Sequence, residues 1–118
     1  MKEKLKSFLY VYEALASKRG LDIVAMDLKG NSSISDFFVL VTANSDVHMG
    51  TLRDVSVEAL EKHGLTCTVE GRDSTQWCLI DAGEVVVHVF SVKGRAFYKL
   101  DSIWGDSDIL KYAYTYDD

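Results

Sequence analysis

The chain has 118 residues, of which 47% are hydrophobic and 26% charged, enough for one domain with its own core. This composition excludes a largely disordered protein. The net charge of −5 is unevenly spread: the first 20 residues hold five basic and two acidic side chains, and the remaining 98 hold eight basic and sixteen acidic ones. An acidic body repels phosphate backbones, so we expect little direct nucleic-acid contact and favour a basic protein as partner.

Cysteine usage and hydropathy indicate the compartment. Cys67 and Cys78 lie inside expected strands, and we interpret them as reduced thiols that pack like small hydrophobic residues. No apolar run approaches the length of a membrane span, and no signal peptide is visible. We therefore expect a cytoplasmic protein with no membrane association.

Hydrophobic periodicity and turn residues predict the element order α-β-β-α-β-β-β-α. Ser45 is the expected N-cap of the second helix, and Gly20 and Gly64 are expected to end the first and second helices. The expected ranges are a helix over 5–19, strands over 22–28 and 37–43, a helix over 47–63, strands over 65–69, 77–80 and 85–90, and a helix over 93–104. The inner stripe of the second helix is expected to hold Leu52, Val55, Ala59, Leu60 and His63.

A helix between strands allows a parallel crossover, whereas hairpins imply antiparallel pairs. The prediction is therefore an α/β (α+β) fold with a mixed five-stranded sheet flanked by helices. One domain is expected over residues 1–105, followed by an acidic C-terminal tail over 106–118. Residues 85–90 are almost wholly apolar and mostly β-branched, which places that strand in the middle of the sheet. Gly83 suits positive φ in the turn before it.

Three large aromatic residues, Trp77, Tyr98 and Trp104, flank this hairpin and the helix after it. Trp77 begins its strand, and we expect it at the edge of the sheet, where one face of the ring can meet a partner. Aromatic side chains at the margin of a core suit a partner-binding site. They also suit an ordinary core contact, and for Trp77 the sequence favours neither interpretation.

The search for catalytic groups finds little. His48, His63 and His88 show no metal-ligand spacing with one another or with the cysteines. His48 and His63 lie near helix ends and look structural, and His88 in mid-strand is typical of a buried, hydrogen-bonded histidine rather than a general base. We predict no catalytic residue, no metal site and no cofactor.

One segment faintly resembles a nucleotidyltransferase. A turn of small residues over 30–33 precedes Asp36, where such enzymes hold phosphate and then magnesium. Two-metal phosphoryl transfer needs a second carboxylate two positions later on the same strand face. Phe38 stands there instead. The metal-binding pair is missing, so we predict that the chain is not an enzyme of this kind.

Motifs along nearly the whole chain resemble the ribosomal silencing factor family, also called RsfS or Iojap. Residues 22–38 resemble its "DI-ALD--GKSSITD" pattern; Thr42, Ser45 and His48 match "TG-SS-H"; Glu70, Gly71 and Trp77 match "EG----W"; Asp81, Gly83, Val85, His88 and Val89 match "D-GD-IVHV"; and Tyr98, Leu100 and Trp104 match "LY-LE-LW". The likeness covers roughly residues 5–105. The chain departs from it at Asn31 and Ala43, where lysine and glycine are usual, and in the tail after Gly105.

The resemblance implies a mixed α/β fold similar to nucleotidyltransferases, without their activity. It implies binding to the large ribosomal subunit through ribosomal protein fourteen of that subunit, at the face where the small subunit docks. Such binding prevents subunit joining and represses translation, notably when nutrients are scarce. Members of the family often form homodimers.

The resemblance also implies a partner-binding surface. Trp77 would be its central anchor, and Tyr98 and Leu100 would extend its apolar part. The charged residues carried over are Glu70, Asp73, Asp81 and Glu84, which offer carboxylates to a basic partner, and Arg95 and Lys99, which would pair with acidic groups there.

Two other classes of function stay open on the residues alone. A nucleotidyltransferase-like nucleotide-binding domain or enzyme would bind magnesium with ATP or GTP. A homodimeric assembly module would show a dimer mass without co-sedimenting with ribosomes.

Overall fold

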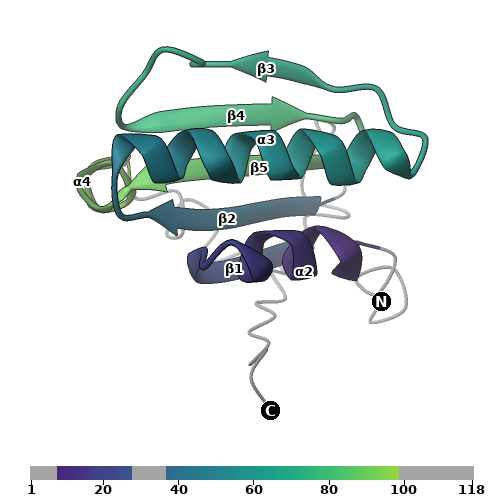
Figure 1. The fold of residues 1–118 in the computed structure, drawn as a ribbon, viewed down its shortest axis with the longest axis horizontal. Helices are drawn as coiled ribbons and strands as arrows, with labels where there is room; N and C mark the ends of the chain where they lie inside the picture. The colour runs from purple at the N-terminus through teal and green to yellow at the C-terminus, as the bar shows by residue number, and fades with distance from the viewer. Residues whose placement is uncertain (1–7, 28–36, 99–118) are drawn as a thin grey trace.

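The computed structural model describes residues 8–27 and 37–98 (Figure 1). The predicted turn at 29–33, Asp36, Lys99, Leu100, Trp104 and the acidic tail lie outside these residues. The elements are α2 (Leu9–Ser17), β1 (Leu21–Asp27), β2 (Phe37–Ala43), α3 (Asp46–Lys62), β3 (Thr68–Glu70), β4 (Trp77–Asp81), β5 (Val85–Ser91) and α4 (Val92–Tyr98). No helix among the described residues is long and apolar enough to cross a membrane.

The five strands form one mixed sheet in the order β1-β2-β5-β4-β3. β2 and β5 pair in parallel, and the other three pairs are antiparallel. The predicted fold class is therefore confirmed, and β5 occupies the middle of the sheet as its apolar run indicated. Figure 1 shows α3 running along the strands in front of β5, between β4 and β2. α2 lies beside it over β1, and α4 lies at one end of the sheet.

The main core lies between the sheet and helices α2 and α3. Alternate residues of a strand face opposite sides of a sheet, and Val85, Val87 and Val89 of β5 all point toward these helices. Leu15 of α2 and Leu52 of α3 meet them and are fully buried. We call this side of the sheet the helix face, and the opposite side, where Leu40 and Phe90 are also buried, the second face.

Both ends of α3 are formed as the sequence predicts. The Ser45 hydroxyl accepts a hydrogen bond from the His48 backbone N–H at 3.0 Å, which satisfies a free donor of the first turn. Gly64 adopts φ of 87° just past the last turn, where a left-handed residue lets the chain turn away. The His48 ring nitrogens contact the Asn44 N–H and the Lys18 carbonyl, so this histidine is structural and joins the start of α3 to the end of α2.

The buried stripe of α3 differs from the prediction in part. Met49, Leu52, Ser56 and Leu60 are its buried residues. Ser56 was missed because a hydroxyl suggests exposure, yet it donates to the Leu52 carbonyl at 2.8 Å and so has no unsatisfied donor. His63 is exposed and stacks on the ring of Tyr10 at a centroid distance of 3.6 Å. The third strand is also shorter than the predicted 65–69 and begins at Thr68.

The end of α2 corrects a second expectation. Arg19, not Gly20, takes the left-handed conformation, with φ of 64°. The Arg19 N–H donates to the Ala16 carbonyl and the Gly20 N–H to the Leu15 carbonyl, both at 2.9 Å, the hydrogen bonds of a Schellman end. Gly20 serves another purpose. A Cβ built there would lie 2.7 Å from Cγ2 of Val41, so glycine is needed for close packing of the chain on β2.

Alanine substitutions at two glycines should have opposite effects on stability. Gly20→Ala should lower the free energy of unfolding by about 1–3 kcal/mol, because the new methyl group overlaps Val41 in the core. Gly50→Ala should raise it by about 0.5–1 kcal/mol, because Gly50 lies within α3 and its nearest neighbour would be 3.7 Å away. Urea unfolding of both variants measures these changes. A Gly20→Ala protein as stable as the wild type would contradict the packing argument.

Candidate partner-binding surface

The second face of the sheet is rich in aromatic side chains. The residues of β2, β4 and β5 that point away from α2 and α3 include Phe38, Trp77, His88 and Phe90. Tyr98 of α4 joins them at one end, 4.6 Å from Trp77 between ring centroids. We call Phe38, Trp77, His88, Phe90 and Tyr98 the aromatic cluster. The strand residues that face α2 and α3 are mostly aliphatic, and the aromatic cluster lies on the opposite side of the sheet.

Trp77 is held in this cluster by contacts on several sides. Its ring stacks on Phe90, its register partner on β5, at 5.4 Å between centroids. Its indole Nε1–H donates to Nδ1 of His88 at 3.1 Å. Its backbone N–H donates to the Ser74 hydroxyl at 3.2 Å, which holds the chain as it enters β4. The side chain remains half-buried, so Trp77 supports the fold and still presents part of its ring to solvent.

The expected place of Trp77 at the edge of the sheet is wrong in one respect. β4 lies between β5 and β3 and is not the edge strand. β3, however, pairs only with the stretch from Leu79 to Asp81, so Trp77 and Cys78 lie beyond the paired segment. The sequence could not show this, because it depends on how far the short edge strand extends.

His88 is a buried histidine with one satisfied nitrogen. Its side chain is 2% exposed, and its ring packs 4.5 Å from Phe38 between centroids. Since an indole N–H can only donate, Nδ1 of His88 must accept, and the proton of the neutral ring is on Nε2. Nε2 has no hydrogen-bond partner among the described residues. Burial lowers the pKa of His88 to about 4, so the ring is neutral at physiological pH and is a structural histidine.

Three of the other predicted site residues lie near Trp77. Glu70 pairs with Leu79 across β3 and β4 and is exposed on the same sheet face as Trp77. Asp73 is exposed in the loop that leads to Trp77. Arg95 of α4 is half-buried, and its guanidinium donates to the Thr42 hydroxyl at 3.0 Å, which ties α4 to the end of β2.

Asp81 and Glu84 lie at the other end of the β4–β5 hairpin. Asp81 is four residues beyond Trp77 along β4, about 13 Å at the usual rise of a strand. Its carboxylate accepts the Gly83 N–H at 2.8 Å and stabilises the turn, in which Gly83 has φ of 87°. The structure therefore does not place these two carboxylates in one patch with Trp77 and Tyr98.

The sequence analysis missed the exposed apolar residues of α4. Phe97 is 74% exposed and Val92 62% exposed, next to Tyr98 at 38%. The edge of the Tyr98 ring faces Phe97 at 5.0 Å between centroids. A signal was present, because a seven-residue helix with Val92, Phe97 and Tyr98 on different sides cannot bury all of them against one sheet.

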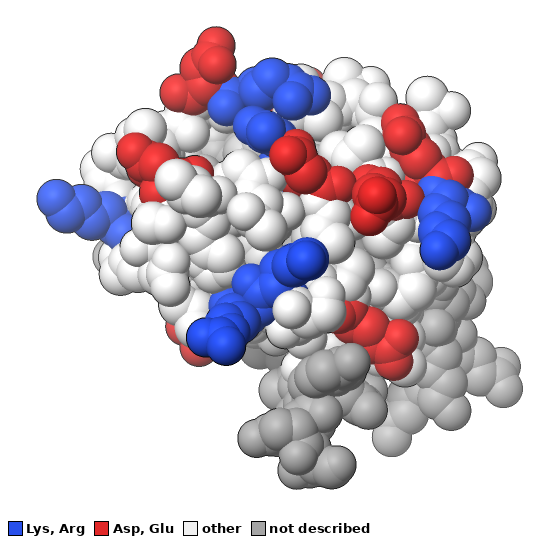
Figure 2. Space-filling model, viewed as in Figure 1, with Lys and Arg blue, Asp and Glu red and all other residues white. Residues whose placement is uncertain are grey.

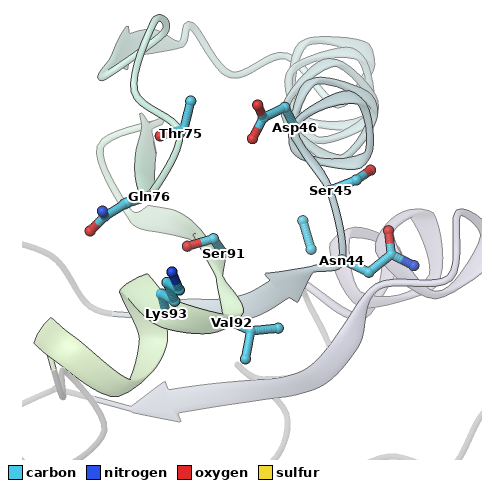
Figure 3. A pocket seen from close by; sticks show the side chains of 9 residues that line it. Asn44, Ser45, Asp46, Thr75, Gln76, Ser91, Val92 and Lys93 are labelled. Carbon is cyan, nitrogen blue, oxygen red and sulfur yellow. The ribbon is translucent and has the colours of Figure 1, made fainter.

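A second feature lies beside α4, at the carboxyl ends of the parallel strands β2 and β5 (Figure 3). A cavity of about 420 Å³ there is lined by Ala43, Asn44, Ser45, Asp46, Thr75, Gln76, Ser91, Val92 and Lys93. Open α/β sheets commonly bind ligands at such a position. Asp46 is the one carboxylate in the lining. Across residues 8–27 and 37–98, no three His, Cys, Asp or Glu side chains come together to hold a metal ion.

The fold and the surface together define a mixed α/β domain that presents an aromatic cluster with exposed carboxylates beside it. The family described as "Ribosomal silencing factor during starvation", RsfS, matches residues 2–116. This match spans nearly the whole chain. The chain belongs to the RsfS family of ribosomal silencing factors, as its motifs indicated, and the family is not one of known enzymes.

Relatives and solved structures agree with this assignment. The ribosomal silencing factor RsfS of Bacillus subtilis is 37% identical over 106 residues, which cover 88% of this chain and 90% of the relative. That of Haemophilus influenzae is 30% identical over 96 residues, covering 80% and 94%. A crystal structure of a Chromobacterium violaceum protein superposes with a TM-score of 0.78 at 29% identity, covering 90% of this chain and 88% of that one.

The pKa of His88 predicts a specific dependence of stability on pH. The unfolded chain takes up a proton at His88 near pH 6.5 and the folded chain only near pH 4, so acid favours the unfolded state between these values. The stability contributed by the neutral ring is complete above pH 6.5 and lost as the pH falls to about 4. The difference between the two pKa values corresponds to about 3 kcal/mol.

Urea unfolding of the wild type and of His88→Leu, each at pH 7.5 and pH 4.5, measures this contribution. The other titratable groups are common to both proteins, so the difference between them isolates His88. The wild type should lose more stability between the two pH values than the variant. Equal losses would show that His88 is protonated as easily in the folded chain as in the unfolded one.

Proposed function

We propose that the chain binds the large ribosomal subunit through a basic ribosomal protein, ribosomal protein fourteen of that subunit, and so blocks association with the small subunit. This action represses translation without any chemical step. One observation carries the proposal: the half-buried Trp77 and partly exposed Tyr98 form a continuous aromatic surface with exposed carboxylates nearby. Membership of the silencing-factor family supports the ribosome as the target.

The aromatic surface has the properties of a binding hot spot. Trp and Tyr are enriched among residues whose truncation costs most binding energy, since each brings a large area with few torsions to order. Trp77 is already held by Phe90 and His88, so little conformational entropy remains to be lost on binding. Phe97, next to Tyr98 on α4, adds exposed apolar area.

The net charge of the chain favours a basic protein over RNA. Glu70 and Asp73 are exposed beside the cluster together with Arg72 of the same loop, and the chain as a whole carries −5. Figure 2 shows the helix face, opposite the aromatic cluster, where the described acidic and basic groups are interspersed and form no continuous basic stripe. Complementary charge accelerates association with a basic partner, whereas a phosphate backbone would be repelled.

Blocking by occlusion sets quantitative requirements on the protein. A bound copy silences one large subunit, so repression follows the fraction of subunits occupied and needs roughly stoichiometric amounts of protein. The small subunit and the silencing factor should therefore compete for the same large subunits. A homodimer, which the family resemblance implies, would have to leave the aromatic cluster of at least one protomer accessible.

Sucrose-gradient sedimentation with isolated subunits tests this proposal. The protein should co-sediment with large subunits, and prior addition should reduce the peak of joined ribosomes when small subunits follow. Ribosomal RNA stripped of protein should bind much more weakly than whole subunits, because a net charge of −5 repels the phosphate backbone. Equal binding to stripped RNA would overturn the assignment of a protein partner.

Three alanine variants separate binding from folding. Phe97→Ala should weaken subunit binding with little change in unfolding, because the side chain is 74% exposed. Trp77→Ala should weaken binding by about 2 kcal/mol or more, roughly 30-fold, and should also destabilise the fold by about 3 kcal/mol because it packs on Phe90 and Tyr98. Val47→Ala is the control: Val47 is 81% exposed at the start of α3, on the helix face rather than in the aromatic cluster, and should change neither quantity.

Affinity is measured per folded molecule at a temperature where all variants are native. The surface is misassigned if Trp77→Ala and Phe97→Ala both bind like the wild type. If Val47→Ala alone weakens binding, the contact lies at the start of α3 instead.

A further inference from the structure

We propose that His88 is a positioning residue, whose Nδ1 holds the indole of Trp77 in the orientation that the partner recognises. This inference rests on the proposed function, in which Trp77 is a binding anchor. It assigns to a buried histidine a role in recognition that its burial alone does not require.

The geometry starts with the hydrogen bond between the two side chains. Nε1 of Trp77 donates to Nδ1 of His88 at 3.1 Å, and the two rings lie 5.9 Å apart between centroids. His88 is itself firmly placed, since β5 is the central strand and His88 pairs with Leu40 on one side and Leu79 on the other. Its ring is confined by Phe38 and lies parallel to Phe90 within 10°. Trp77 is therefore hydrogen-bonded to a side chain that its own neighbours hold in place.

A histidine at this position carries a cost that an apolar residue would avoid. Its Nε2–H is buried and has no partner among the described residues, and an unpaired buried donor destabilises a fold. The other positions of β5 from Val85 to Val89 are all valine, which has no such group. A leucine would fill the site with no orphaned ring nitrogen. What the imidazole provides, and an aliphatic side chain cannot, is the acceptor at Nδ1.

The consequence of that acceptor is a fixed direction for the indole. Trp77 is half-buried, so without the bond its N–H can turn to water and the ring can occupy other rotamers. With the bond, the N–H edge is turned to the sheet, and the exposed part of the ring is always the same. A partner that binds this part does not have to order the ring first, which raises affinity without any contact to His88.

Two substitutions separate positioning from a purely structural role. His88→Leu removes the acceptor and keeps the core filled. His88→Asn keeps an acceptor, because its side-chain oxygen can take the place of Nδ1, but leaves part of the ring volume empty. Val86→Ala is the matched control: Val86 is buried on the same strand and the same sheet face, two residues away, and has no bond to Trp77. All are made in a Trp104→Phe background, which leaves Trp77 as the single tryptophan.

The first measurement is the indole N–H signal of Trp77 by NMR, with its rate of exchange with water. We expect His88→Leu to shift the signal and speed exchange at least tenfold, His88→Asn to stay close to the wild type, and Val86→Ala to leave it unchanged. The second is affinity for large subunits per folded molecule, beside urea unfolding. His88→Leu should bind at least fivefold more weakly while unfolding near the wild-type urea concentration. His88→Asn and Val86→Ala should unfold at lower urea yet bind within twofold of the wild type.

These readouts distinguish failure of the inference from failure of the proposed function. An unchanged Trp77 signal in His88→Leu overturns the positioning role whatever the ribosome does. So does a wild type that binds subunits while His88→Leu binds equally well, or affinity that follows stability across all three variants. A wild type that does not bind large subunits overturns the proposed function and, with it, the claim that the fixed indole serves recognition.

Discussion

The parallel pairing of β2 with β5 is the constraint on which the rest of the domain depends. The two strands run side by side from Phe37 against Val85 to Ala43 against Ser91, and both are buried along almost their whole length. A parallel pair cannot be closed by a tight turn and requires a long crossover. Here the crossover contains α3, which covers the helix face, and the β3–β4 segment, which extends the sheet beyond β5.

This pairing also decides where the proposed binding surface lies. Because β2 and β5 are parallel, their last residues lie side by side at one end of the strands, and α3 and α4 begin next to each other there. β4 runs antiparallel to β5, so its first residue, Trp77, lies at the same end of the strands, opposite Phe90. Gly94 lets α4 lie close to the chain just before Trp77, since a Cβ at Gly94 would overlap the Gln76 carbonyl. Tyr98 is thereby brought onto Trp77 across more than twenty residues of sequence.

The sequence predicted the parts of the fold whose causes are local. The apolar runs of β2 and β5, the Ser45 cap and the glycine at position 83 each act through neighbouring residues, and each was placed correctly. The errors concern what depends on tertiary contacts. Arg19 takes the left-handed position, and Gly20 instead lies against Val41, a residue on another element.

The arrangement of the proposed binding surface could not be predicted from the sequence. The site residues carried over from the family resemblance include Trp77, Tyr98, Asp81 and Glu84 without distinction of place. Strand register then separates them: Trp77 lies opposite Phe90 and Asp81 opposite Val86, at the two ends of one hairpin. The pattern of α4 shows that Val92, Phe97 and Tyr98 cannot all be buried, but which of them is exposed depends on the side of the helix that meets the sheet.

Trp77 is part of the core and also partly exposed, so core and interface are not exclusive alternatives for this residue. A fully exposed tryptophan would be mobile and would lose much entropy on binding, whereas a fully buried one would offer no contact area. The Trp77 ring is stacked on Phe90, hydrogen-bonded to His88 and still partly exposed. It therefore offers contact area and has little entropy left to lose on binding. The aromatic cluster beneath it is then the support of the anchor as well as part of the core. If Trp77 is the anchor that we propose, substitutions under the surface, at residues that the partner does not touch, weaken recognition while the fold remains intact.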